Sequence, residues 1–264
     1  MNIVKSLLTE NPCYTANKKI RVKGLMLHSV GCSQPKASVF INQFNKPTYK
    51  RACVHGFIDA NDGVIYQTLD WNHRGWHSGK GSKGSANDTH IGVEMCEPNC
   101  ITYTSGSKFT ITDKTKAQEM VKTTYNSAVE LFTYLCKEYN LNPLEDIISH
   151  SEGHKMGIAS NHGDPEHLWK GVGLPYTMDS FRQDVKNMMN NNLVENNNDN
   201  KSFIVKILIS NLNIRKGAGL SYSKAGVCPK GSYTIIDTKI KDGYTWGKLK
   251  SGAGWIALEY TKRI

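Results

Sequence analysis

The sequence predicts an α/β domain, with a mixed β-sheet flanked by helices, followed by a small all-β domain. Short apolar runs alternate with helical patterns through the first two thirds of the chain, as in layered α/β domains. The pair Asp62-Gly63 separates two of these runs and indicates a β-hairpin, so at least one strand pair is antiparallel and the sheet is mixed. Beyond an Asn-rich stretch, only short apolar runs bounded by turn residues remain, a pattern typical of all-β units.

Each element follows from its hydrophobic pattern. The longest helix is expected at about 113–139, where apolar residues recur at helical spacing: Ala117, Val121, Ala128, Leu131, Phe132 and Leu135. Shorter helices are expected at about 37–45 and 181–189. Apolar runs of strand length predict the strands of the first domain: 23–29, 54–60, 64–69, 91–96 and 147–149. Those of the second domain are expected at 203–209, 233–237, 245–250 and 255–258.

The Asn-rich stretch 189–202 divides the chain into a domain at 1–188 and a domain at 203–264. It offers too little apolar surface to bury, and we expect it to be a linker. Charge divides at the same place, because residues 203–264 hold 11 Lys/Arg against 3 Asp/Glu, a balance of +8 in a chain of +10. A basic small domain favours an anionic partner, either nucleic acid or an acidic polymer of a cell wall.

Length and composition exclude several classes of protein. No apolar run approaches the roughly 18 residues that a membrane-spanning helix requires. The N-terminal segment lacks the apolar core, about 7 to 15 residues long, of a signal peptide. We therefore expect a protein that is made in the cytoplasm without a signal peptide and does not insert into a membrane. The seven cysteines form no Cys-x-x-Cys pair, which favours reduced, mostly buried thiols over a disulfide framework.

Four polar residues stand within or directly after short segments of the first domain. His28 follows the apolar run 24–27, Glu94 lies in a predicted strand, His150 follows another, and Asp164 precedes a proline. Catalytic zinc usually takes three protein ligands from His, Cys, Asp and Glu and leaves one position to water. His28, His150 and Asp164 offer such a set, with Glu94 as a general base.

Spacing alone does not assign the histidines to a metal ion. A histidine after an apolar strand is more often an ordinary hydrogen-bonded residue than a ligand. His150 and His154 could also be an i, i+4 pair on a helix, although Gly153 between them argues against a helix there.

Glu94 has a sharper local argument. In a strand whose Ile91, Val93 and Met95 face one way, Gly92 and Glu94 face the other. A carboxylate beside a glycine leaves room for a ligand.

Seven segments of the first domain together resemble the amidase-2 type of zinc-dependent N-acetylmuramoyl-L-alanine amidases. This family includes phage endolysins and is related to peptidoglycan recognition proteins. The resembling segments occur in the family's order and lie within about residues 20–185: GLMLHS (24–29), VHGFID (54–59), DGVIYQ (62–67), GWHSG (75–79), HIGVE (90–94), ISH (148–150) and GDP (163–165). The resemblance implies a Zn²⁺ ion held by His28, His150 and Asp164, with Glu94 as the general base.

The resemblance also places a cationic or hydrogen-bonding residue two positions before the third ligand. Here that residue is His162, where many relatives have lysine, and it is expected to stabilise the oxyanion of the reaction. The segment between His150 and Asp164 is longer than in compact members, so His162 could itself be the third ligand, with Asp164 supporting it. Val54 stands where some phage members carry a catalytic tyrosine.

Three further residues match family positions near the cleft, and we expect them to bind substrate: His55, Trp76 and His77. Core packing is the alternative role for each. The bond that the resemblance implies is the amide between the lactyl group of N-acetylmuramic acid and L-alanine in bacterial peptidoglycan.

The small domain resembles bacterial SH3-type barrels through four segments: LNIRKG (212–217), PKG (229–231), WGKL (246–249) and GWI (254–256). Such modules bind cell-wall peptides or polymers, so this one would hold the enzyme on its insoluble substrate. The expected partners are peptidoglycan and anionic wall polymers rather than nucleic acid, and we expect a monomer. Without a signal peptide the chain fits a phage-type endolysin, released from the host cytoplasm onto the wall, better than a bacterial autolysin.

Two other classes of protein remain as alternatives. A non-catalytic peptidoglycan-recognition protein would typically lack part of the ligand set, which is complete here. A Cys-His peptidase would need an activated thiolate, and Cys32, Cys53 and Cys96 show no helix N-terminal setting that would lower the pKa of a thiol.

Overall fold

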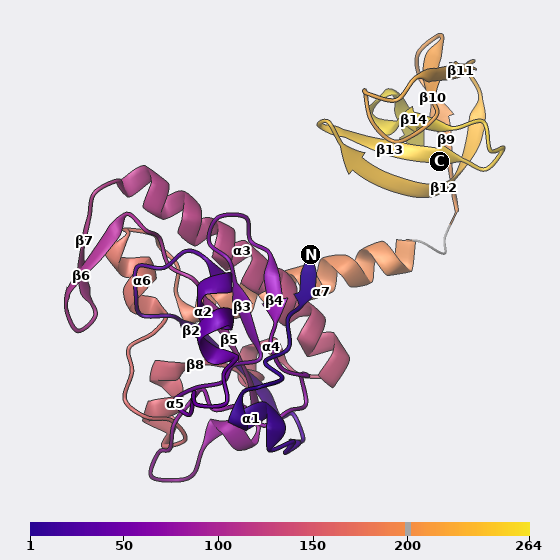
Figure 1. Cartoon of the computed structure of the whole chain (residues 1–264). Helices are drawn as coiled ribbons and strands as arrows, with labels where there is room; N and C mark the ends of the chain where they lie inside the picture. Colours follow the sequence, from indigo (N-terminus) through magenta and orange to yellow (C-terminus); the bar gives the residue numbers. More distant parts are fainter. Residues whose placement is uncertain (199–201) are drawn as a thin grey trace. The chain divides into compact units, whose positions relative to one another are not determined.

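The computed structural model describes residues 1–198 and 202–264 (Figure 1). The chain forms two compact units, Met1–Met189 and Asn190–Ile264, which are described separately. Among the described residues, no helix combines the length and the apolar character needed to cross a membrane.

A six-stranded sheet in the order β1-β4-β3-β5-β2-β8 is the centre of the first unit. Its strands are β1 (Ile3–Lys5), β2 (Gly24–Ser29), β3 (Gly56–Ile58), β4 (Ile65–Gln67), β5 (His90–Met95) and β8 (Ile147–Ser149). The pair β3–β4 is antiparallel and every other neighbouring pair is parallel. Gly63, in the turn of the β3–β4 hairpin, has φ +73°, a conformation that favours glycine. The predicted mixed sheet is confirmed.

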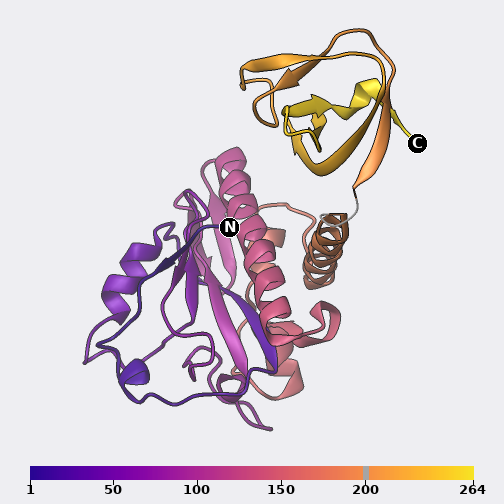
Figure 2. The same ribbon diagram turned by 90° about the vertical axis from the view of Figure 1, so that its right-hand side faces the viewer.

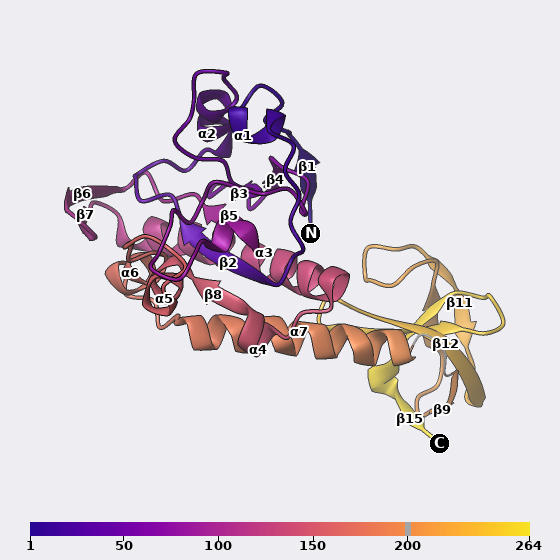
Figure 3. The ribbon, with the colours of Figure 1, turned by 90° about the horizontal axis from the view of Figure 1, so that it is seen from below.

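Helices cover both faces of this sheet. The long helix α3 (Lys114–Tyr139) runs along one face together with α7 (Met178–Asn198), and α2 (Ala37–Phe44) lies on the other side (Figures 2 and 3). On the α3 face, Leu27 and Val93 from the sheet pack with Phe132 and Phe181 from the helices. The remaining short elements are α1 (Pro12–Thr15), η1 (Ala86–Asp88), β6 (Ile101–Ser105), β7 (Lys108–Ile111), α4 (Pro143–Asp146), α5 (His150–Met156) and α6 (Glu166–Gly171).

Helix α5 overturns the expectation that Gly153 prevents a helix after β8. Ser149 caps this helix, because its side chain accepts from the backbone N–H of Glu152 at 3.0 Å while the Glu152 carboxylate accepts from the N–H of Ser149 at 2.9 Å. Glycine at 153 allows close packing, since a Cβ there would lie 2.7 Å from Cε of Met26 and 3.2 Å from Cβ of Ala159. A close approach to the sheet, and not a break in the helix, explains this glycine.

Helix α7 also differs from expectation, because it continues to Asn198 instead of ending near 189. The stretch from Met178 to Asn198 contains no proline or glycine, so the Asn-rich composition weakens the helix without a residue that would stop it. Of the expected linker 189–202, the part at 199–201 lies outside the described residues.

The second unit is a seven-stranded antiparallel sheet in the order β11-β10-β14-β13-β12-β9-β15. Its elements are β9 (Phe203–Ile207), β10 (Leu212–Arg215), β11 (Lys224–Cys228), β12 (Ser232–Lys241), β13 (Tyr244–Leu249), β14 (Trp255–Ala257), η2 (Leu258–Tyr260) and β15 (Thr261–Arg263). Alternate residues of the strands, among them Val205, Ile207, Ile235 and Leu249, form its own core. From Phe203 onward the unit is all-β apart from the short turn η2, as expected for 203–264.

Candidate metal centre

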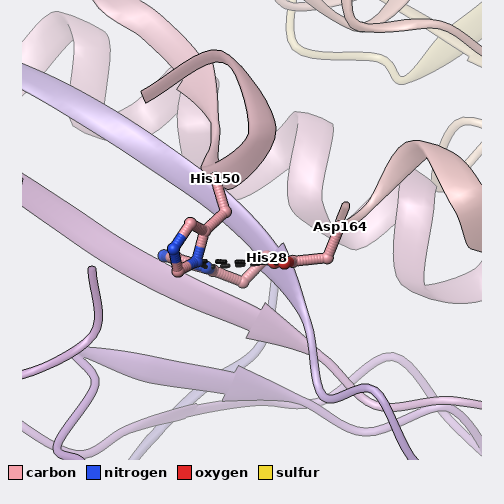
Figure 4. Close-up of side chains that lie close together, drawn as sticks. All are labelled: His28, His150 and Asp164. Atoms are coloured by element: carbon pink, nitrogen blue, oxygen red, sulfur yellow. Dashed lines mark hydrogen bonds and ion pairs between the residues drawn. The ribbon is translucent and has the colours of Figure 1, made fainter. Parts of the chain in front are cut away.

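Three neighbouring parallel strands deliver polar side chains to one edge of the sheet. His28 lies at the end of β2, and its register partner on β5 is Glu94. His150 follows β8 directly as the first residue of α5. Because the carboxyl ends of parallel strands meet at the same edge, these side chains converge. Asp164 joins them from the loop that precedes α6 (Figure 4).

The donor atoms of His28, His150 and Asp164 gather at one point. Nδ1 of His28 lies 3.1 Å from Oδ2 of Asp164 and 3.1 Å from Nδ1 of His150. Nδ1 of His150 lies 3.8 Å from Oδ1 of Asp164. All three residues are buried, and one ligand atom from each lies within 4.8 Å of the others. Two imidazoles and one carboxylate, converging with no fourth protein ligand among the described residues, are a donor set that fits a catalytic divalent metal ion such as zinc.

Electrostatics keep His150 and Asp164 in the protonation states that metal binding requires, whereas His28 is shifted toward its protonated form. Burial lowers the pKa of His150 to about 4, so this imidazole is neutral at pH 7. Burial opposes the ionisation of Asp164, but the hydrogen bond from His28 outweighs it and lowers the pKa of the carboxyl. Burial likewise acts to lower the pKa of His28, and the bond to Asp164 reverses this into a raised pKa. A proton between His28 and Asp164 uses the same donor atoms as a metal ion, so the two compete.

His77 orients the His28 ring. Nε2 of His77 lies 3.1 Å from the carbonyl oxygen of His90, and Nδ1 of His77 lies 3.0 Å from Nε2 of His28. A carbonyl only accepts, so in the neutral His77 ring Nε2–H donates to it, and Nδ1 accepts a hydrogen bond from Nε2–H of His28. Burial lowers the pKa of His77 well below its ordinary value, which keeps this ring neutral. The chain of bonds leaves Nδ1 of His28 to face the cluster.

Glu94 lies beside the cluster with an unused oxygen. Its Oε2 is buried and has no hydrogen-bond partner among the described residues. Burial raises the pKa of the carboxyl to about 7, and the nearby His28 opposes this rise. A buried polar atom without a partner is costly, so this oxygen points to a ligand or water that binds at the site.

A cavity of about 830 Å³ opens over the cluster. It is lined by His28, Ser29, Val30, Gly31, Arg51, Ala52, Trp76, His77, Gly79, Glu94, Tyr103, Gly106, Ser107, His150, Ser160, Asn161, His162, Gly163, Asp164 and His167. This volume is that of a typical small-ligand site. Trp76 and His77, two of the three predicted substrate-binding residues, lie on its wall.

His55 does not line the cavity, and the expectation that it contacts substrate is corrected by its surroundings. The side chain is fully buried. Its Nε2 donates to the carbonyl oxygen of His73 at 2.7 Å, and its Nδ1 accepts from the N–H of Gly92 at 3.0 Å. Because both ring nitrogens are hydrogen-bonded to the backbone, His55 connects β5 to the segment around His73. Core packing, the alternative role, holds for this residue.

His162 lies next to the cluster but outside it. Its ring centroid is 4.5 Å from that of His150, and its Nδ1 lies 3.1 Å from Oγ of Ser160. The group of converging ligand atoms contains Asp164 and not His162. His162 is exposed and lines the cavity, a position from which it can donate to a bound molecule.

The hairpin β6–β7 brings to the cavity residues that were not predicted from the sequence, among them Tyr103. Tyr103 donates to Oε2 of the buried Glu97 at 2.7 Å and lies 2.7 Å from Nε2 of His167. The N–H of Gly31 donates to Oε1 of Glu97 at 3.0 Å. This network ties the hairpin to the ends of β2 and α6. Alternating apolar residues on both sides of Gly106 were the signal for the hairpin.

The structure is that of an α/β protein with a buried His-His-Asp cluster at the carboxyl edge of a mixed sheet. The chain belongs to the N-acetylmuramoyl-L-alanine amidase family, whose model matches residues 18–167. A segment of 38 residues is 49% identical to the N-acetylmuramoyl-L-alanine amidase CwlH of Bacillus subtilis (strain 168). That match spans 14% of this chain and only 15% of the length of CwlH.

Two solved structures show the same fold. The hydrolase AmiA of Staphylococcus aureus, in complex with its ligand, aligns with a TM-score of 0.54 and 18% identity over 74% of this chain and 86% of that chain. The solution structure of the PlyG catalytic domain aligns with a TM-score of 0.50 and 20% identity, over 72% and 96% of the two chains. These similarities concern the fold.

Proposed function

We propose that the protein is a zinc-dependent N-acetylmuramoyl-L-alanine amidase that cleaves the amide between N-acetylmuramic acid and L-alanine in bacterial peptidoglycan. One observation carries the proposal. In a chain of the amidase family, His28, His150 and Asp164 converge beside the unpartnered Oε2 of Glu94, at the floor of an open cavity. A metal ligand set, a base and space for a substrate are what metal-assisted hydrolysis requires.

His28, His150 and Asp164 would hold the zinc ion, and His77 would fix the orientation of His28. Zinc, when bound in such a site, lowers the pKa of its water toward about 7 and polarises the scissile carbonyl. The carboxylate of Asp164 offsets part of the charge of a divalent ion.

Glu94 would carry the proton of the reaction. As the oxygen of water bonds to the lactyl carbonyl carbon, Oε2 of Glu94 accepts a proton from that water. The carbon–nitrogen bond then breaks, and the same proton passes to the departing nitrogen of L-alanine, which leaves a lactyl carboxylic acid and a free amine. A carboxyl whose pKa is about 7 suits both halves of this transfer at neutral pH.

His162 would stabilise the negative charge that develops on the carbonyl oxygen. It is exposed on the cavity wall beside His150, so it can donate to an oxygen bound near the cluster. One well-placed donor of this kind contributes about 3 kcal/mol to lowering the barrier.

Mass spectrometry of digested peptidoglycan tests this function directly. Cleavage by the zinc-loaded protein should release stem peptides with new L-alanine amino termini. New reducing sugar ends, or cuts within the stem peptide, would show a different hydrolase. An undigested wall that still binds the protein would support the alternative of a recognition protein, which the complete ligand set and Glu94 argue against.

The Cys-His peptidase alternative finds no support at the site. No cysteine is among the described residues that line the cavity. Burial raises the pKa of the Cys32 thiol to about 11, which is opposite to the activation that a nucleophilic thiol needs.

We propose further that the second unit is an SH3-type module that binds the cell wall. A groove of about 290 Å³ in this unit is lined by Tyr244, Trp246 and Tyr260, with Arg215 and two asparagines beside them. Aromatic faces with a few polar groups suit a wall peptide or sugar, and the basic unit suits anionic wall polymers. A monomeric phage-type endolysin that reaches the wall after release from the cytoplasm accounts for both units.

A further inference from the structure

Arg51 is the one side chain with a permanent positive charge among the described residues that line the cavity. It precedes β3, is exposed, and makes no hydrogen bond or ion pair with the residues that the structure describes. Arg74, close in sequence to the same wall, is by contrast paired with Asp88 at 2.6 Å. The Arg51 guanidinium is therefore free to bind an anionic group on a molecule in the cavity.

The wall that carries Arg51 is anchored. Two residues further along, Cys53 is fully buried and forms an isolated β-bridge with Trp76. The N–H of Cys53 donates to the carbonyl oxygen of Trp76 at 3.1 Å, and the N–H of Trp76 donates back at 2.8 Å. Ala52 and Trp76 line the cavity next to Arg51. A cation and an aromatic face are thus held together on one wall.

The charges of the cavity favour an anionic segment of substrate at this wall. Glu94 and Asp164, the carboxylates of the lining, lie at the cluster, where a bound divalent ion would balance their charge. Arg51 is not part of the cluster, so its positive charge remains for a molecule bound in the cavity. An arginine fork binds a carboxylate through two parallel hydrogen bonds, which an amide cannot reproduce.

The chemistry of the substrate identifies its first free carboxylate after the scissile bond. The lactyl carboxyl of the sugar is part of the scissile amide, and the carboxyl of L-alanine is in the next peptide bond. The second stem residue, D-glutamate, is joined onward through its γ-carboxyl, so its α-carboxylate is the first free one. It lies about two residues, or about 7 Å, from the scissile bond.

We propose that Arg51 is a specificity-determining residue that binds the α-carboxylate of the D-glutamate in the stem peptide. This inference rests on the proposed amidase function. It implies that the protein discriminates against walls in which this carboxylate is amidated.

The test compares two muramyl tripeptides that differ only at this group. Zinc-loaded full-length protein carrying Glu94→Gln is titrated calorimetrically with N-acetylmuramyl-L-Ala-γ-D-Glu-L-Lys and with its D-isoglutamine analogue, so that binding is measured without turnover. The carboxylate form should bind about fivefold to tenfold more tightly, the scale of a partly exposed arginine–carboxylate pair. With Arg51→Gln added, the two tripeptides should bind equally. Arg74→Gln, the matched control outside the cavity lining, should keep the preference.

Equal affinities before Arg51 is changed, a preference that survives Arg51→Gln, or no binding of either tripeptide would each overturn the proposal. Cleavage is measured separately with Glu94 intact. If neither tripeptide is cleaved but the Arg51-dependent preference holds, the amidase function fails and the carboxylate site stands. If both are cleaved but bind equally, the amidase function stands and the role of Arg51 fails.

Discussion

The imidazole of His77 fills the space that Gly92 leaves on β5, and a Cβ at residue 92 would overlap its ring. From the sequence, a glycine beside Glu94 was expected to make room for a ligand. The room instead holds the histidine that bonds to Nε2 of His28 at 3.0 Å. Gly92 therefore acts on the His-His-Asp cluster through His77 and not by direct contact with a bound molecule.

Gly92→Ala should weaken metal binding although residue 92 is not a ligand. The added methyl displaces His77, and loss of such a supporting bond typically lowers metal affinity about 10- to 100-fold. Competition with a chromophoric zinc chelator measures the change. Gly226→Ala is the control, because that strand glycine has open space where its Cβ would lie. His77→Phe keeps the ring volume without the bond and should give the same loss; normal affinity in both variants would contradict the role of His77.

Glu94→Gln should keep zinc and lose nearly all activity. The amide has the shape of the carboxylate but cannot accept the proton of water, a function worth about 10² to 10⁴ in rate. Release of peptide from a muramyl tripeptide, followed by chromatography, gives the rate, and elemental analysis gives the zinc content. Glu119→Gln, at a position of α3 away from the cavity lining, should leave the rate unchanged. A Glu94→Gln protein that clears walls at the normal rate would mean that another group is the base.

The variants Asp164→Ala and His162→Ala should differ in zinc content and in activity. Asp164→Ala removes one of the three converging ligands, so the purified protein should contain far less than one zinc ion per chain. His162→Ala should retain zinc but lose about 10² to 10³ in kcat, as expected for a lost oxyanion donor. The opposite pattern, zinc lost with His162→Ala and kept with Asp164→Ala, would make His162 the third ligand.

The groove of the second unit should affect wall binding but not the chemistry. Tyr260→Ala removes an aromatic face of the groove and should reduce the fraction of protein that sediments with purified walls. Hydrolysis of a soluble tripeptide should be unaffected. Ile240→Ala, at a residue 82% exposed on β12 and outside the groove, serves as the control. Equal sedimentation of both variants and the parent protein would exclude this groove as the wall-binding site.

The strands and the long helix could be predicted because each has a local signal. The run before His28 has the length of a buried strand, and Asp113 is a capping residue at the start of α3, with its side chain accepting from the N–H of Lys116 at 2.9 Å. Local sequence patterns do not show which residues distant in sequence come into contact. The same pattern that marked Gly153 as a helix breaker could not show that Met26 packs against it.

The candidate site likewise has a part that the sequence predicts and a part that only the structure shows. His28 and His150 follow strands, so their meeting at one edge is a consequence of the predicted sheet. The bond between His77 and His28 joins residues 49 positions apart, and Gly92, which makes room for it, has no signal of that contact in the sequence. His55 lies next to a strand, as His28 and His150 do, so the sequence does not distinguish it from a residue of the site. Only the structure shows that backbone groups form hydrogen bonds with both of its ring nitrogens.

The buried, neutral His55 should make the free energy of unfolding decrease as pH falls. Burial lowers its pKa to about 4 in the folded protein, against about 6.5 when unfolded, so the unfolded chain binds an extra proton between these values. The stability that the neutral His55 contributes is complete above pH 6.5. It is lost as pH falls through 4, and the free energy of unfolding decreases by about 3 kcal/mol in all. Urea unfolding of the chelator-treated protein at pH 6.5, 5.5 and 4.5 should therefore show a smaller decline in His55→Gln than in the parent.

Comparison of the two proteins isolates His55 from groups that titrate in the same range. Burial raises the pKa of Glu97 to about 7, so its contribution has the opposite sign and grows as pH falls from 7 toward 4.5. That contribution is present in both proteins and cancels in the difference. His154→Gln changes an exposed histidine of α5 and should leave the decline as it is in the parent. If stability falls as steeply with pH in His55→Gln as in the parent, protonation of His55 in the unfolded chain is not the cause of the acid-dependent loss of stability.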